Sequence, residues 1–234
     1  LIGCNCDTCC SHDQKDKRLR ASALIETDDI TLLIDAGPDL RQQLLRHPVQ
    51  HIDGILITHE HYDHIGGLDD VRPFGDVPVF AEVNVLNSIQ RNMPYCFTEN
   101  RYPGVPRLRL QTISTEPFQI DKTLIQPLRA LHARLPVLGF RIGNMAYLTD
   151  VKSLPEDTLP LLHDLDILVL NALRHETHIA HLTILEAIRL ATQIGARKTF
   201  FTHFSHDIGK HEIVSLILPD NMYLAFDGLA LHFE

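Results

Sequence analysis

Four side chains able to bind a metal ion lie within the stretch H-E-H-Y-D-H: His59, His61, Asp63 and His64. His59 and His61 are two residues apart, so in extended backbone they point the same way. Asp63 and His64 follow after the chain has begun to turn, and they face a neighbouring spot. This spacing can supply one metal ion from the two histidines and a second from the Asp–His pair. Imidazole suits zinc and similar first-row metals, and a carboxylate extends the choice to manganese.

The segments on either side of this stretch decide how it is held. Residues 52–57 are apolar and predict a buried strand. Gly66 and Gly67 follow the stretch and lead into a short predicted helix, so the candidate ligands sit between a strand and a helix. A solvated loop that happens to be rich in histidine is the alternative. It requires the residue types and the strand-to-helix context to coincide by chance.

Cysteines form a second group near the start of the chain. Thiolates at Cys4, Cys6 and Cys9 can converge on one ion, and a closed structural zinc site needs four ligands. The fourth is Cys10 or a distant residue; we favour a distant histidine, such as His206, because adjacent cysteines rarely share a metal. A redox Cys-x-x-Cys pair and a set of inert loop cysteines are the alternatives. So local a grouping is unlike a disulfide framework and is typical of a reducing compartment.

Single residues at the ends of later predicted elements extend the candidate set. Asp150 follows a strand at 145–148, where a carboxylate can bridge two cations. His203 follows a strand at 198–202 and is the natural last ligand of the second metal. His181 lies just ahead of a helix predicted over 182–194, where its side chain can face a cleft.

Composition limits the function classes. The 234 residues can bury a large core, and 44% apolar with 22% charged residues is ordinary for a soluble globular protein. The formal charge of −9 gives no global attraction to nucleic acid or to an anionic membrane, and no apolar run approaches the length of a membrane span. We therefore expect one domain over residues 1–234 in the cytoplasm. Residues 92–107 contain three prolines and predict a loop beside the active site, a homodimer contact or a surface excursion.

The motif H-x-H-x-D-H resembles that of the metallo-β-lactamase superfamily of binuclear metallohydrolases. This resemblance implies an α/β fold in which two mixed sheets flanked by helices form a four-layer αββα sandwich. Its first strand and glycine-rich turn would precede Leu1, so a targeting segment there stays open. The resemblance implies that His132, otherwise a lone histidine after a strand, gives the first metal its third nitrogen. It also implies that Asp35, otherwise a plain turn residue, supports the metal-binding loop.

Further motifs are similar to a narrower group, the phosphonate-pathway phosphodiesterases that act on cyclic ribosyl phosphates. These motifs are G-C-x-C-x-x-C from Gly3, H-L-T from His181 and T-H-x-S-H from Thr202, and the resemblance covers essentially the whole chain. Residues 171–175 depart from the expected substrate loop, so the resemblance does not identify the sugar or nucleotide.

The resemblance implies specific roles for these residues. His181 would be the catalytic acid. One divalent metal, zinc or manganese, would be held by His59, His61, His132 and Asp150. The second would be held by Asp63, His64, Asp150 and His203. A structural zinc would be held by Cys4, Cys6, Cys9 and His206. Independently of the resemblance, we expect Asp63 to be catalytic and His175 and His178, in the loop next to His181, to contact the substrate.

The chemistry of such a centre suits an anionic phosphodiester. Two divalent ions that share Asp63 and Asp150 among neutral histidines leave a local charge of about +2. The metals would lower the pKa of a bridging water, whose hydroxide attacks phosphorus, and His181 could protonate the leaving alkoxide. We thus predict a binuclear phosphodiesterase for a small cyclic phosphate or nucleotide-like phosphodiester. The alternatives are a tRNA-processing nuclease, a thioester or lactone hydrolase, and a cofactor-pathway binding protein.

The charge balance gives a direct test of the nuclease alternative. With a formal charge of −9 and no basic run, the protein should not retain tRNA at physiological salt, because phosphate contacts by Lys and Arg dominate nucleic-acid affinity. A gel-shift titration at several salt concentrations measures this. Tight, salt-sensitive binding would contradict the prediction and favour RNA processing.

Overall fold

The computed structural model describes residues 1–100 and 102–233. Its internal contacts divide the chain into two compact units. We call Arg20–Ile125 the central unit, and Leu1–Leu19 together with Gln126–Glu234 the terminal unit. None of the described helices has the length and apolar character that a membrane crossing needs. That the units act as one domain stays a prediction.

The central unit contains a mixed five-stranded sheet in the order β1-β2-β3-β4-β5. The pair β1–β2 is antiparallel and the remaining pairs are parallel. The strands are β1 (Ala23–Glu26), β2 (Thr31–Ile34), β3 (Gly54–Leu56), β4 (Asp76–Ala81) and β5 (Arg107–Thr112). The helices are α1 (Leu40–Arg46), α2 (Tyr62–Ile65) and α3 (Val83–Asn92), with 3-10 turns at η2 (Leu68–Phe74) and η3 (Pro94–Cys96).

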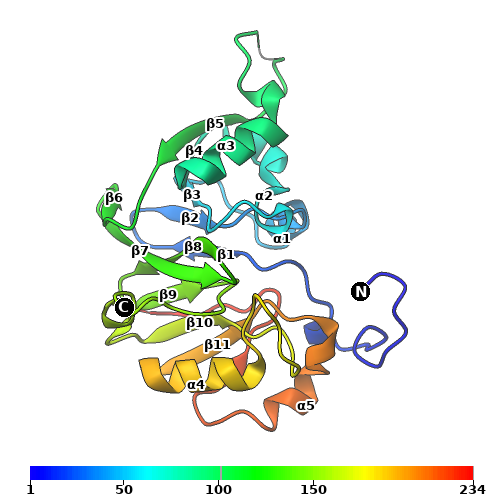
Figure 1. Cartoon of the computed structure of the whole chain (residues 1–234). Coiled ribbons are helices and arrows are strands. Elements are labelled where there is room, and N and C mark those ends of the chain that lie inside the picture. Colours follow the sequence, from blue (N-terminus) through cyan, green and yellow to red (C-terminus); the bar gives the residue numbers. More distant parts are fainter. Residues whose placement is uncertain (101, 234) are drawn as a thin grey trace. The chain divides into compact units, whose positions relative to one another are not determined.

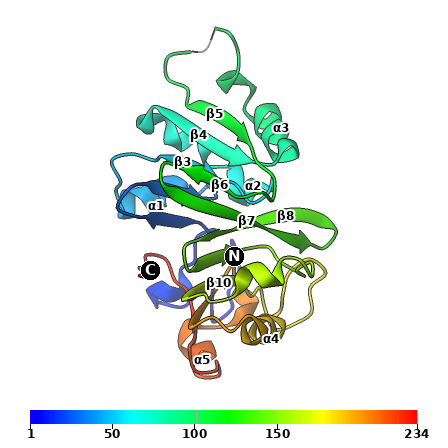
Figure 2. The ribbon, with the colours of Figure 1, turned by 90° about the vertical axis from the view of Figure 1, so that its left-hand side faces the viewer.

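Burial in the central unit follows the sequence pattern. All four residues of β2 are buried, and β4 alternates, with Val77 and Val79 on its buried side. Helix α3 is amphipathic and packs Val85 and Ile89 into the same apolar cluster as those two valines. In Figures 1 and 2, α3 accordingly lies beside β4 and β5.

The terminal unit contains a mixed sheet in the order β12-β11-β10-β9-β8-β7. Strands β9 to β12 pair in parallel, and β8 pairs antiparallel with β9. The elements are β7 (Thr123–His132), which enters this unit at Gln126, β8 (Leu135–Ile142), β9 (Met145–Leu148), β10 (Ile167–Asn171), β11 (Lys198–Thr202), β12 (Met222–Leu224), α4 (Ile184–Ile194), α5 (His211–Ser215), η1 (Gln14–Asp16), η4 (Leu159–Leu162) and η5 (His206–Ile208). Within the central unit, β6 (Phe118–Ile120) pairs antiparallel with Thr123–Ile125, the start of β7.

Helix α4 is stabilised by a cap at each end and by a buried apolar face. The side chain of Thr183 accepts from the backbone N–H of Glu186, and the Glu186 side chain accepts from that of Thr183. These two reciprocal bonds form a capping box. Gly195 ends the helix with a φ of 74°, a conformation open to glycine. The buried face packs against β10 and β11 (Figure 1).

Proline and glycine interrupt three segments of the terminal unit. Residues 155–162 form only the 3-10 turn η4, because Pro160 lacks an N–H and cannot continue a helix that starts before it. Gly209, whose φ is 96°, separates η5 from α5. Gly228 turns the chain with a φ of 88°, and no strand follows over residues 229–233.

The loop after β2 packs directly against the H-x-H-x-D-H motif. Ala36 donates its N–H to the carbonyl of His64, and Gly67 donates to the carbonyl of Ala36, both at 2.7 Å. A Cβ atom on Gly37 would overlap the carbonyl oxygen of Asp63. Glycine is needed there because two stretches of backbone touch, and this contact fixes the motif against the end of β2.

Candidate metal centres

The motif forms a cluster in the central unit, called here the central cluster: Asp35, His59, His61, Asp63 and His64. Nε2 of His59 lies 3.0 Å from Nδ1 of His61, and the rings of His59 and His64 lie 4.2 Å apart. Nε2 of His64 is 3.3 Å from a carboxylate oxygen of Asp63. His59 and His64 are each 1% exposed. The motif thus brings its ring nitrogens together as the spacing predicts.

Asp35 supports this cluster through hydrogen bonds with Thr58 and His64. It is fully buried and sits at the end of β2 with a φ of 61°. Its carboxylate accepts from the N–H of Thr58 at 2.8 Å, from the Thr58 hydroxyl at 2.9 Å, and from Nδ1 of His64 at 2.6 Å. The bond to Nδ1 fixes the tautomer of His64 and leaves the Nε2 lone pair available for a metal, as carboxylate partners of metal-binding histidines do.

The terminal unit brings together a second set, called here the terminal cluster: His132, Asp150, His181 and His203. One oxygen of Asp150 lies 3.2 Å from Nε2 of His203, and the other lies 3.5 Å from Nδ1 of His181. Nδ1 of His132 donates to the backbone carbonyl of Asp150 at 3.0 Å. Ligand atoms of His132, Asp150 and His181 all lie within 4.8 Å of one another, a geometry that can hold a metal ion.

The backbone around Asp150 is held in an uncommon conformation. Asp150 has a φ of 56° and His203 a φ of 58°, values that few residues other than glycine adopt. The Asn171 side chain accepts from the N–H of Val151 at 2.7 Å and donates to its carbonyl at 3.1 Å. The Thr149 hydroxyl donates to Asp150 at 3.0 Å. These bonds fix the carboxylate in its orientation.

His181 lies inside the terminal cluster. Its ring is 4.6 Å from that of His132 and 5.1 Å from that of His203. Burial is the largest cause that lowers the pKa of His181, to about 3; the other histidines lower it further and Asp150 raises it. The ring is therefore neutral near pH 7. To act as an acid, it must gain a proton when a negatively charged group binds beside it.

The two other loop histidines occupy different places. The His178 ring lies 4.9 Å from that of His181, and burial, followed by Arg174 and Lys152, lowers the pKa of His178. Nε2 of His175 instead donates to the carbonyl of Ile208 at 3.0 Å. His178 therefore borders the terminal cluster, whereas His175 holds a neighbouring loop.

The third cluster is formed by Cys4, Cys6, Cys9 and His206, whose ligand atoms lie within 4.8 Å of one another. Nδ1 of His206 is 3.4 Å from the sulfur of Cys6 and 3.6 Å from that of Cys4. The hydrogen bond with His206 lowers the pKa of the Cys6 thiol to about 6, which favours the thiolate that a metal requires. Cys10 is exposed and lies outside this cluster, and no disulfide joins any of the five cysteines.

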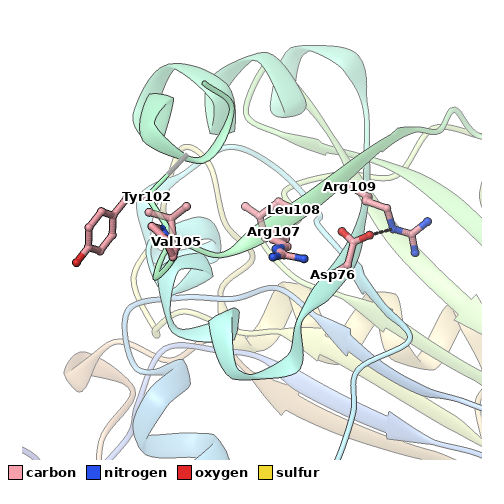
Figure 3. Close-up of a pocket in the computed structure, with 7 residues that line it drawn as sticks. Asp76, Tyr102, Val105, Arg107, Leu108 and Arg109 are labelled. Atoms are coloured by element: carbon pink, nitrogen blue, oxygen red, sulfur yellow. Dashed lines mark ion pairs between the residues drawn. The ribbon is translucent and has the colours of Figure 1, made fainter. Parts of the chain in front are cut away.

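Residues 102–107, the last part of the segment over 92–107, contribute to a surface hollow in the central unit. The hollow has a volume of about 420 Å³ and is lined by Asp76, Tyr102, Pro103, Val105, Arg107, Leu108 and Arg109 (Figure 3). In Figure 3, Asp76 faces Arg109, and their ion pair spans 3.2 Å. None of the residues predicted to form the site lines it.

Apart from Asp35, the residues that orient the candidate ligands were not predicted from the sequence. Thr58 lies in the motif, but its bonds to Asp35 depend on a contact between segments 23 residues apart. Asn171 is at a strand end, which is a signal, but its two bonds to Val151 are not visible in the sequence.

The chain matches a known protein family over a range that contains two of the three clusters. A family model described as a β-lactamase superfamily domain matches residues 31–204. This range includes the central and terminal clusters and leaves out the cysteine cluster. A curated protein of Porphyromonas gingivalis named octanoyltransferase is 42% identical, over 97% of this chain and 48% of that protein. The chain thus spans about half the length of that relative.

Two solved structures match this chain over nearly their whole length. A diphosphatase from the PhnP family is 37% identical with a TM-score of 0.93, covering 100% of this chain and 92% of that one. Zinc-bound PqqB from Methylobacterium extorquens is 20% identical with a TM-score of 0.78, covering 99% and 95%, and this likeness concerns the fold alone. The predicted α/β fold with two mixed sheets flanked by helices is confirmed.

Asp35 gives a test of the central cluster. Asp35→Asn keeps the size of the side chain but replaces one acceptor oxygen with a donor, so it cannot accept from both Thr58 and Nδ1 of His64. We expect zinc affinity to fall by roughly 10- to 100-fold, measured by calorimetric titration of the apoprotein. Asp53→Asn is the matched control, since Asp53 accepts a backbone N–H from Thr31 in the same unit. Equal affinities in the two variants would contradict the role of Asp35.

Proposed function

Since the chain belongs to the metallo-β-lactamase superfamily, we propose that it is a binuclear metal-dependent phosphodiesterase acting on a small, nucleotide-like substrate. The observation that carries the proposal is the 37% identity to a PhnP-family diphosphatase across 92% of that chain. In a diester of diphosphate, each phosphorus carries two bridging and two non-bridging oxygens, as in an ordinary phosphodiester. One site can therefore accept both bonds, and the leaving group, phosphate or alkoxide, distinguishes them.

The donor sets fit divalent metal ions. Nδ1 of His181 is buried without a hydrogen-bond partner among the described residues and faces an Asp150 oxygen. In the central cluster, two ring nitrogens meet at 3.0 Å and can share only one proton. We propose that these side chains bind two divalent ions, zinc or manganese. Bound there, the ions would supply Lewis-acid activation of water and neutralise phosphoryl charge.

Residues of the chain would hold the ligand groups in position and supply a proton. Asp35 and Asn171 fix the orientation of the groups that carry the ligands. The phosphoryl group of a bound substrate is negative, and its approach would raise the pKa of His181 from its depressed value. The protonated ring can donate to the leaving oxygen. An alkoxide needs that proton more than a phosphate does, because phosphate is the weaker base.

A second candidate is hydrolysis of an acyl thioester. It is favoured by the 42% identity to the protein named octanoyltransferase. That name describes a protein twice as long, so the activity can belong to the part that this chain does not match. The proposal includes a small anionic substrate, no nucleic-acid or membrane partner, and a cytoplasmic location.

A substrate panel separates the two candidates. The metal-loaded protein is assayed with an aryl phosphodiester, a cyclic ribosyl phosphate, a nucleoside diphosphate diester and an octanoyl thioester. We expect at least one of the phosphorus substrates to give a kcat/KM tenfold or more above that of the thioester. Asp150→Asn, which removes a ligand, is the control for contaminating hydrolases. A higher kcat/KM for the thioester, or no turnover of any phosphorus substrate, would reject the proposal.

His181→Ala tests the proton donor. The variant should retain both metals, and its turnover of a diester with a poor alkoxide leaving group should fall by at least about a hundredfold. The loss should be smaller for nitrophenolate or phosphate leaving groups. His178→Ala and His175→Ala should be milder and act mainly on KM. Loss of a metal from His181→Ala would instead identify a ligand, and near-normal turnover of the alkoxide substrate would exclude the acid role.

A further inference from the structure

The loop over residues 203–209 carries candidate ligands for two different metal sites: His203 in the terminal cluster and His206 in the cysteine cluster. Nε2 of His203 lies 3.2 Å from Asp150 in the terminal cluster, and Nδ1 of His206, three residues later, lies 3.4 Å from the Cys6 sulfur. His203 also holds a left-handed backbone conformation, with a φ of 58°. A change in the position of His206 is therefore transmitted through very few backbone bonds to His203.

Arg18, in the N-terminal segment, forms hydrogen bonds with this loop. Its guanidinium donates to the carbonyl of Ser205 at 3.3 Å and to that of Gly209 at 2.8 Å, so it joins the two ends of η5. It also donates to Asp16 at 3.0 Å and lies over the ring of Phe204. The Arg18 side chain is only 13% exposed.

Asp16 fixes the guanidinium in turn. Its side chain is 1% exposed, and the same oxygen that pairs with Arg18 accepts from the N–H of His211 at 2.8 Å, at the start of α5. The ion pair is buried, so its geometry is restricted: a displaced guanidinium would leave a buried carboxylate without its charge partner. Cys9 lies on the same N-terminal segment, and its carbonyl accepts from the Lys17 ammonium.

We propose that Arg18 is a positioning residue that couples the cysteine cluster to the hydrolytic centre. A metal at the cysteines draws His206 and the N-terminal segment together. Arg18 then holds Ser205 and Gly209 so that His203 points at Asp150. By linkage, each metal raises the affinity for the other by the same factor. The inference rests on the proposed function only in taking His203 as a ligand of the hydrolytic centre.

The guanidinium is suited to this task in a way that an ammonium is not. Its planar fork can serve two carbonyls and a carboxylate at fixed angles, whereas a lysine ammonium is a compact charge on a flexible chain. Arg18→Lys should therefore keep the ion pair with Asp16 but lose the clamp on the two carbonyls. Arg18→Met should lose both.

The experiment uses the full chain loaded with cobalt(II). Thiolate-to-cobalt absorption in the near ultraviolet reports the cysteine cluster, and the visible bands of nitrogen- and oxygen-bound cobalt report the hydrolytic centre. Affinity at the hydrolytic centre, kcat, KM and the thermal midpoint are measured for both Arg18 variants. Arg197→Met is the matched control, because Arg197 pairs with Asp166 on the surface of the same unit and is 82% exposed.

We expect Arg18→Lys to keep a thermal midpoint well above that of Arg18→Met. Both variants should bind cobalt at the hydrolytic centre about tenfold more weakly, the lower end of the usual effect of supporting residues. Their kcat should fall more than their KM changes. In the unmodified protein, prior loading of the cysteines should strengthen the second site, and this gain should shrink in Arg18→Lys.

Two results would overturn the inference. Hydrolytic-centre affinity that recovers fully in Arg18→Lys, or that stays normal while the thermal midpoint falls, would reduce Arg18 to a stabilising role. If both Arg18 variants fail to fold, Asp16→Asn, which keeps the size and the acceptor oxygen, is measured in the same way against the same criteria. A protein that hydrolyses no phosphodiester would reject the proposed function, while the cobalt affinities would still decide this inference.

Discussion

Burial of a carboxylate at the end of a strand is the constraint on which both ligand clusters depend. Asp35 and Asp150 are 0% and 2% exposed, and a carboxylate cannot remain ionised in such a place without donors or cations around it. Each is therefore surrounded by imidazoles and hydroxyl groups, and each has a left-handed backbone. Such strain costs roughly 1–3 kcal/mol per residue and persists only where the surroundings enforce it. In each unit the sheet enforces a conformation that serves the site.

The types and spacing of the ligands could be predicted from the sequence because they are local. H-x-H-x-D-H spans the loop after β3 and the short helix α2, and its resemblance to a known motif implies the fold class. His132, Asp150 and His203 could be found as single residues at strand ends, the first of them only by resemblance. The supporting bonds could not be predicted. Thr58, Asn171 and Arg18 act through contacts between segments that lie 20 or more residues apart, and no periodicity records them.

The fold by itself does not select the reaction. Relatives of this chain bear names as different as a diphosphatase and an octanoyltransferase, and one scaffold commonly hosts several chemistries. Under the proposed function, the preference for a substrate depends on its leaving group and on whether a proton reaches that group. His178 and His181 lie on one loop, and burial and neighbouring charge lower the pKa of both rings.

The terminal unit is assembled from both ends of the chain, whereas the central unit is a single uninterrupted segment. Cys4 and the histidine it faces are 202 positions apart in the sequence. During synthesis, residues 20–125 can complete their own sheet while the cysteines still lack a partner. The thiols must then remain reduced until β11 and the loop after it emerge from the ribosome. Closing so long a loop is slow, so we expect capture of a metal by the cysteines to be a late event in folding and the step most sensitive to oxidants.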